Sequence, residues 1–414
     1  MSTALTSIPT LVQSPFIIVT IGGHTFGSYS ADGTSTNGMP LNVQYPNYMK
    51  SISIVKVNGT VNTYTLNLSY QVGIGQDPNL LDKIFSKATK DRKIILQYGD
   101  WNAPTQIYKE EQAIITNITS SLNMSDGSID YTISCTSDAI GLTSIKHNFP
   151  SVTAKGSEII LNLLRNSRYG LTSVFKGMQN ISKVLSSGLI ASSDKTIHLL
   201  AQTGLTVLDY LNYVVDSMMS NTSSITGLSD SNYYLSIHDD VNNIFGGTYF
   251  KITEVSKNNS PSIINSLDTY ELDVNYPGDN FVTEFSLNND QSWSILYEYA
   301  ENINQEKYSY HIDNMGRMVT SDSPNLLRSD YTGNQSSTKT QWWTKMTQFP
   351  VEATVTIKGL ARPSILMTYV KLNVWFAGGM KHISSGLYII TKQVDQIDSS
   401  GYKTTLTLLR VGGD

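Results

Sequence analysis

The stretch Val351-Glu-Ala-Thr-Val-Thr-Ile-Lys358 alternates apolar with polar residues, and the chain closes on Gly386-Leu-Tyr-Ile-Ile-Thr391 and Gly401-Tyr-Lys-Thr-Thr-Leu-Thr-Leu-Leu-Arg410. Alternation with a period of two is typical of a strand that buries one face. Asp398-Ser-Ser-Gly401 supplies turn residues between the last two strands. Residues 340–414 are therefore predicted to form a small antiparallel β-barrel.

A related β-rich block opens the chain over residues 1–150. The runs Ile52–Val57 and Val61–Tyr70 flank Asn58-Gly59, and Asn-Gly is a strong short signal for a hairpin. Asp77-Pro78 offers the cap and the first residue of a helix, and the apolar residues that follow repeat at helical spacing. This block is predicted to be a second antiparallel barrel with one inserted helix.

In the segment between these two blocks, the sequence pattern changes from strand-like to helical and then back to strand-like. Residues 151–230 are predicted to be a helical insert, in which Thr206-Val-Leu-Asp209 resembles a capping box. Residues 231–339 are predicted to be a β-rich middle domain. Residues 320–341 are rich in Ser, Thr, Asn and Asp, and we expect a mobile or partner-ordered loop there. The predicted fold class is mainly β with a helical insert.

Composition suggests a surface rich in neutral polar groups. Charged residues make up 15% of the 414 residues, against about 25% in typical proteins. The 24 tyrosines fit a chain that contacts other subunits, or equally an ordinary soluble β protein. A net charge of −5 without a long basic run argues against broad binding to nucleic-acid phosphates.

Other features of the sequence narrow the class of protein. The single Cys135 excludes an internal disulfide and is predicted to be a buried core thiol. The N-terminus has no basic region followed by an apolar run, so we expect no signal peptide. No run of about 18 apolar residues predicts a transmembrane helix.

Candidate chemical groups are few. His238-Asp239-Asp240 is predicted to be a solvated turn, because adjacent strand residues point to opposite faces. Glu110-Glu111 alternate faces for the same reason, which argues against a paired acid and base. His311 and Asp313 share a strand face, but two ligands are too few for a metal site. We expect no catalytic residue, no metal and no cofactor.

The order of these blocks resembles the central baseplate hub of contractile phage tails. That family includes the late-control D protein and the hub part of type VI secretion spikes. The resemblance rests on the N-terminal barrel, the insert around residues 156–219, and the strands of residues 281–287 and 308–316. The closing Gly386-Leu-Tyr and Gly401-Tyr-Lys-Thr complete it.

The resemblance implies a homotrimer whose chains each give two tube-like barrels, formed by residues 1–150 and 340–414, the second either alone or with strands borrowed from residues 233–319. Six barrels in a ring would join a sixfold ring of tail-tube protein above to a separate threefold spike protein below. We expect contacts with other baseplate proteins, and a lumen through which DNA passes without sequence-specific recognition. The expected location is the tail baseplate of the virion, after synthesis in the host cytoplasm. Since the chain stops at Asp414, we expect the spike to be another polypeptide.

Candidate interface residues follow from predicted edge strands and loops: Tyr64, Tyr70, Trp342, Trp343 and Tyr388. One alternative is a distal tail or receptor-binding protein, for which Trp101 and Trp342-Trp343 would form a carbohydrate-binding face rather than anchor a core. A tail-associated cell-wall hydrolase is the other alternative, and the sequence offers no residues for its chemistry.

Overall fold

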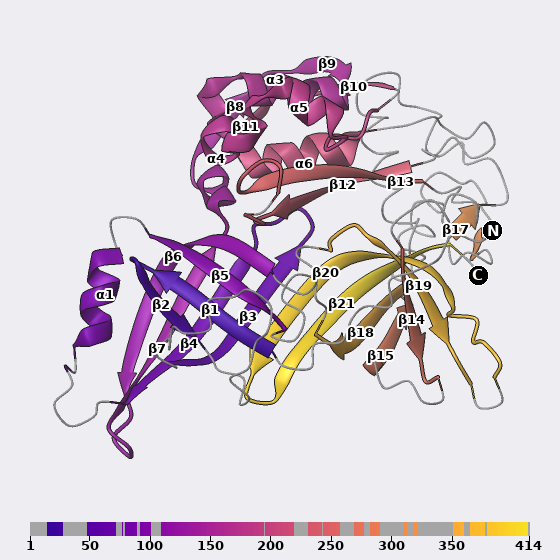
Figure 1. The fold of residues 1–414 in the computed structure, drawn as a ribbon. Helices are drawn as coiled ribbons and strands as arrows, with labels where there is room; N and C mark the ends of the chain where they lie inside the picture. Colours follow the sequence, from indigo (N-terminus) through magenta and orange to yellow (C-terminus); the bar gives the residue numbers. More distant parts are fainter. Residues whose placement is uncertain are drawn as a thin grey trace.

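Most of the chain is antiparallel β-structure, joined by a smaller group of short helices (Figure 1). The computed structural model describes residues 15–27, 48–71, 77, 79–88, 92–100, 109–193, 195–218, 231–241, 243–256, 269–276, 282–289, 310–312, 318–320, 351–359, 365–376 and 379–412. Within these residues one sheet of 13 strands dominates, with the path β15-β18-β21-β20-β3-β4-β7-β6-β5-β1-β2 and with β19 and β14 branching from β20.

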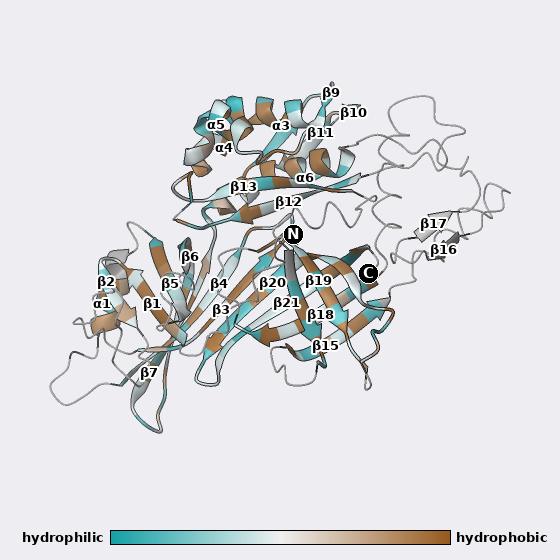
Figure 2. Cartoon of the chain, turned by 45° about the vertical axis from the view of Figure 1, so that its right-hand side comes forward, coloured by the Kyte–Doolittle hydropathy of each residue, from teal (hydrophilic) through white to brown (hydrophobic). Residues whose placement is uncertain are grey.

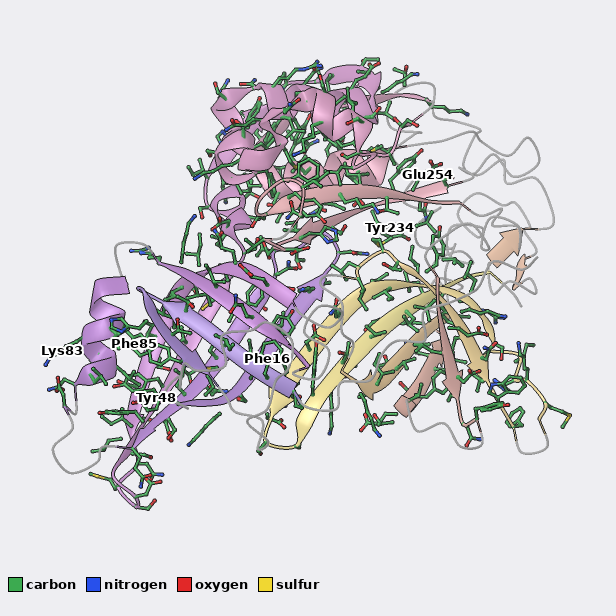
Figure 3. The ribbon with its side chains drawn as sticks, viewed as in Figure 1. Phe16, Tyr48, Lys83, Phe85, Tyr234 and Glu254 are labelled. Atoms are coloured by element: carbon green, nitrogen blue, oxygen red, sulfur yellow. The ribbon has the colours of Figure 1, made fainter. Side chains whose placement is uncertain are left out.

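The first half of this sheet is built from the N-terminal strands. Its strands are β1 (Pro15–Ile21), β2 (His24–Gly27), β3 (Met49–Val57), β4 (Thr63–Gln71), β5 (Lys93–Asp100), β6 (Lys109–Leu122) and β7 (Ser128–Thr136). Along β4 the burial alternates strictly, as period-two patterning predicts. Helix α1 (Leu80–Ala88) lies beside this half, and Figure 3 shows Phe85 pointing from it toward the strands and Lys83 pointing away.

The predicted hairpin around Asn58-Gly59 is confirmed. Strands β3 and β4 pair antiparallel on either side of it, with Ile52 opposite Leu66. Gly59 has a φ of 72°, a backbone conformation that glycine adopts without the steric cost borne by other residues.

The second half of the sheet is built from C-terminal strands. They are β14 (Thr269–Val274), β15 (Val282–Asn289), β18 (Val351–Lys358), β19 (Tyr369–Val374), β20 (Gly386–Asp398) and β21 (Gly401–Gly412). All pair antiparallel except β14 and β19, which run parallel. Figure 2 shows hydrophilic and hydrophobic residues alternating along these strands, as expected where one face is buried.

Strand β3 joins the two halves by pairing with β20. Val394 lies opposite Val55, and Ile397 lies opposite Ile52. Ile397 and Tyr402 also belong to the hydrophobic core of the N-terminal half, so the last hairpin contributes to both halves. The sheet is therefore continuous through the middle of the molecule.

A helical layer lies above the sheet in Figure 1. Its helices are α3 (Gly156–Arg165), α4 (Leu171–Val174), α5 (Ile181–Ser186) and α6 (Val207–Ser217), and its strands are β8 (Lys146–Phe149), β9 (Val152–Lys155), β10 (Thr196–Leu199), β11 (Gln202–Thr206), β12 (Ser231–His238) and β13 (Tyr249–Ser256). One hydrophobic core runs from Ala139 to Ile252, across the predicted boundary at residue 230. Strands β12 and β13 thus share the core of the helices.

The starts of helices α6 and α3 differ in how their first residues are held. The Thr206 cap is confirmed, because the Thr206 hydroxyl accepts from the Asp209 amide at 3.1 Å. Helix α3 begins at Gly156, after Lys155 and without a side-chain cap hydrogen bond. A Cβ at Gly156 would lie 2.2 Å from Met218 Cγ, so the absence of a side chain there lets the two segments approach.

The helical layer also packs on the C-terminal half of the sheet. Figure 3 shows Tyr234 extending from β12 toward the C-terminal strands. Tyr234 contacts a small buried cluster formed by Val255, Met367, Leu387, Ile389 and Val411. Among the helices of the described residues, none is long and apolar enough to cross a membrane.

Candidate functional site

A buried polar cluster lies where the two halves of the sheet meet the helical layer. Its first centre is Glu111 of β6, which is 0% exposed. The Lys56 ammonium of β3 forms an ion pair with its carboxylate. The hydroxyl groups of Tyr98 and Tyr64 donate to the same carboxylate, at 2.8 and 3.0 Å. Glu111 therefore links its own strand to β3, β4 and β5 through charge-assisted hydrogen bonds.

The second centre is Asp239, which directly follows β12 and is 1% exposed. Ser137 Oγ and Thr248 Oγ1 donate to its Oδ1 at 2.6 and 2.7 Å. Asn62 Nδ2 and the Tyr64 hydroxyl lie 2.8 and 2.9 Å from its Oδ2. Tyr64 consequently lies between the two carboxylates and connects the sheet to the helical layer.

Backbone hydrogen bonds hold these two segments in register. The Gln112 amide donates to the Asp239 carbonyl at 3.1 Å, and the Val241 amide donates to the Glu110 carbonyl at 3.0 Å. Glu111 and Asp240 form an antiparallel bridge between them. The residues after β12 thus extend the ladder of β6 for a short distance.

A third buried carboxylate, Asp395 of β20, lies beside this cluster. It accepts from Gln393 Nε2 at 2.7 Å, from Thr404 Oγ1 at 2.6 Å and from the Tyr402 hydroxyl at 3.1 Å. The Tyr402 ring meets the Tyr98 ring edge-on, with centroids 6.3 Å apart. The polar cluster therefore continues from the N-terminal strands into the C-terminal hairpin.

Burial sets the protonation of several of these groups. Desolvation, with the nearby positive charges of Lys56 and Lys251, lowers the pKa of His238 to about 3. Desolvation raises the pKa of Asp239, and the negative charge of Glu111 raises it further, while its hydrogen-bond donors act in the opposite direction. His238 is accordingly neutral at physiological pH, with Nε2 2.9 Å from Ser236 Oγ.

The prediction of a solvated turn at His238-Asp239-Asp240 is wrong for its first two residues. His238 and Asp239 are buried, because polar groups from distant segments replace the water around them. One signal in the sequence pointed to this cluster: Lys56 lies on the same strand face as the buried Ile52 and Ile54. A lysine on the apolar face of a strand needs a buried partner.

The prediction that three of the candidate residues lie at an interface requires correction. Tyr64, Tyr70 and Tyr388 are at most 1% exposed, so their side chains stabilise the interior of the chain and do not face another subunit. Tyr70 donates to the Asp77 carbonyl at 3.0 Å, and Tyr388 to the Ser384 carbonyl at 2.6 Å. A buried tyrosine hydroxyl usually needs a hydrogen-bond partner, and for Tyr70 and Tyr388 that partner lies within the chain.

Other candidates lie outside the described residues, and the predictions for them stand as predictions. They are Trp101, Trp342, Trp343, Asp313, the side chain of His311 and residues 321–341. Cys135 is buried as predicted, and burial raises its pKa to about 12. Within the described part of the chain, no group of three or more His, Cys, Asp or Glu is placed to hold a metal ion.

Comparison with known proteins identifies the class of fold. No protein-family model and no curated protein sequence matches the chain. Among solved structures, the tail protein from Neisseria meningitidis MC58 matches with a TM-score of 0.50 and 10% identity, covering 96% of each chain. This likeness shows that the chain has the fold of a tail protein.

Two further structures belong to the same group of neighbours. The 43 kDa tail protein of prophage MuSo2 from Shewanella oneidensis has a TM-score of 0.48 and 11% identity, covering 96% of this chain and 97% of that chain. The E. coli c3393 protein, a component of the type VI secretion system, has a TM-score of 0.45 and 8% identity, and the match covers 90% of this chain and 77% of that chain. The resemblance to tail proteins that the sequence indicated is confirmed at the level of the fold.

Proposed function

We propose that this chain is a structural baseplate hub of a contractile phage tail or of a related injection particle. In this role it is a trimer that joins the sixfold tail tube to the threefold central spike and lines the channel between them. The continuous sheet through β3 and β20 carries the proposal, in a chain that shares its fold over 96% of its length with a tail protein of known structure. A hub must transmit force between its two ends, and one unbroken sheet suits that task.

Each half of the sheet supports one tube-like barrel in this proposal. The N-terminal half encloses its own core of apolar residues from β1 to β7 and α1. The C-terminal half encloses another, formed by β14, β18, β19, β20 and β21 with β15 at its margin. Three copies of the chain would therefore supply six similar units around one axis, matching a sixfold tube by threefold symmetry.

Strand β15 is the edge that we assign to contact between copies. It pairs with β18 on one side, and among the described residues no strand pairs with its other side. Leu287 of this strand is 42% exposed although its pairing partner, Ala353, is buried. A free edge with an exposed apolar side chain is a template for pairing with another chain.

The proposal includes no catalytic role. The carboxylates of the polar cluster are buried, and each accepts several hydrogen bonds within the chain. A general acid or base must reach a substrate proton, which these groups do not. Their arrangement instead supports the joining of three parts of one structural protein.

The mass of the purified protein in solution tests the proposal, measured by light scattering after size exclusion. We expect a stable trimer of the 45.7 kDa chain. A monomer or dimer that does not trimerise with tail-tube and spike proteins present would overturn the hub and favour a distal tail or receptor-binding protein.

Two matched variants test the assigned edge. Leu287→Asp should weaken the trimer and leave the thermal stability of the monomer unchanged, because the side chain is already partly exposed. Asn288→Asp adds the same charge to the next exposed residue, which points to the other face of β15, and should leave the trimer intact. Trimers of equal stability for both variants would exclude the Leu287 face of β15 as a contact.

A further inference from the structure

The hydroxyl of Tyr64 lies between two buried carboxylates. Its oxygen is 3.0 Å from Glu111 Oε2 and 2.9 Å from Asp239 Oδ2. A phenol has a single hydrogen to donate, so it satisfies one carboxylate oxygen fully. Two ionised carboxylates on one buried hydroxyl repel each other, and such pairs usually retain a proton.

The charges around the cluster are also unequal. Lys56 is the cation in direct contact with Glu111, whereas the four hydrogen-bond partners of Asp239 are the neutral side chains of Asn62, Tyr64, Ser137 and Thr248. The titratable groups that face the cluster come from eight strands or their ends: Lys56, Tyr64, Tyr98, Glu111, His238, Lys251, Asp395 and Tyr402. With His238 neutral and Lys56 paired with Glu111, an ionised Asp239 has neutral hydrogen-bond donors around it but no cation among those four partners.

We propose that Glu111 and Asp239 share a buried proton, held on the Asp239 carboxyl at neutral pH, and that its release loosens the helical layer from the sheet. Glu111 stays ionised because it contacts the Lys56 ammonium. Asp239 takes the proton because its partners Ser137, Thr248 and Tyr64 have hydroxyl oxygens that can accept as well as donate.

The position of the shared proton explains why its loss would act on the whole molecule. Asp239 belongs to the end of β12 in the helical layer, whereas Glu111 and Tyr64 belong to the sheet. Ionising Asp239 places two negative charges on opposite sides of this contact, in surroundings of low dielectric constant. The raised pKa of Asp239 agrees with this arrangement. The contact between the layers is thus linked to proton binding.

The first experiment compares the pH dependence of folding for the wild type and Asp239→Asn. An amide is neutral and has nearly the shape of a protonated carboxyl. A group with a raised folded pKa stabilises the fold below its unfolded value and loses that contribution as pH rises toward the folded value. Across this range the folding equilibrium constant of the wild type should fall relative to the variant, by up to about tenfold per pH unit. If the folding equilibrium constants of the two proteins changed equally with pH through the neutral range, the proposal would be overturned.

A spectroscopic measurement detects the proton directly. The infrared difference spectrum of wild type minus Asp239→Asn at neutral pH should contain the C=O stretch of a protonated carboxyl. The matched control is Asp138→Asn, which replaces a half-buried carboxylate that Gln112 Nε2 contacts at 3.0 Å, and it should remove no such band. If Asp239→Asn fails to fold, the band is sought in the wild type, where it should vanish as pH rises. Its absence from the wild type at neutral pH would overturn the proposal.

Discussion

Lys56 and Glu111 form an ion pair whose side chains are 0% and 1% exposed. They come from β3 and β6, and they lie where both halves of the sheet and the helical layer meet. A buried pair of this kind contributes little over an apolar pair of the same shape, but removing one partner leaves a charge without compensation. Loss of either partner alone should therefore weaken the junction of the three parts.

Lys56→Met should lower the free energy of unfolding by about 3–5 kcal/mol, because Glu111 would remain buried and charged. The double variant Lys56→Met/Glu111→Gln should recover most of that loss, since both members are then neutral. Denaturant unfolding of the single and double variants measures both effects. The exposed pair of Lys50 and Asp130 is the control, and Lys50→Met should cost less than about 1 kcal/mol.

His238 should make the protein sensitive to acid. Its folded pKa of about 3 lies below its ordinary value of 6.5, so the unfolded chain binds more protons between these values. Stability contributed by the neutral imidazole is complete above pH 6.5 and falls by about 1.4 kcal/mol per pH unit toward pH 3. The raised pKa of Asp239 makes stability increase as pH falls, which opposes the effect of His238. The contribution of His238 must therefore be measured by comparing the wild type with a His238 variant.

Unfolding of the wild type and of His238→Gln, measured from neutral to acidic pH, isolates that contribution. Relative to the variant, the wild type should lose stability steadily as pH falls below 6.5. A constant difference between the two proteins over this range would show that His238 is protonated equally in the folded and unfolded chains.

Gly59 should tolerate no side chain. Its φ is 72°, and a Cβ would lie 2.9 Å from Asn212 Oδ1, while Asn212 Nδ2 donates to the Gly59 carbonyl at 2.7 Å. Gly127→Ala is the matched control, because Gly127 has a φ of 68° and open space around it. We expect a cost of about 1–2 kcal/mol for Gly127→Ala from the left-handed backbone alone. Thermal unfolding should show a larger cost for Gly59→Ala, and equal costs would mean that the contact with Asn212 yields freely.

Thr206→Ala should destabilise the helical layer by about 1 kcal/mol. The Thr206 hydroxyl accepts from the Asp209 amide and donates to the Asp209 carboxylate at 2.7 Å, so the variant loses both contacts at the start of α6. Thr206→Ser keeps the hydroxyl and should retain most of the stability. Denaturant midpoints of the two variants make the comparison, and similar losses would assign the effect to the Thr206 methyl group.

Much of the local structure could be predicted from residue patterns. The period of two in Val351–Lys358, the turn at Asn58-Gly59 and the cap at Thr206 each follow from contacts within a few residues. The polar cluster could not be predicted in this way. Tyr64 and Asp239 are 175 residues apart, and Asp239 alone has the appearance of an ordinary surface carboxylate.

The sequence by itself determined which segments are strands or helices and which face of each is apolar, because steric and hydrophobic preferences act over short distances. Only the tertiary structure decided that Lys56, Glu111 and Asp239 are buried together, and that Tyr64, Tyr70 and Tyr388 belong to the interior. Burial of a polar group depends on whether distant segments bring it partners to replace water. That condition is met through pairings such as β3 with β20, which no local pattern specifies.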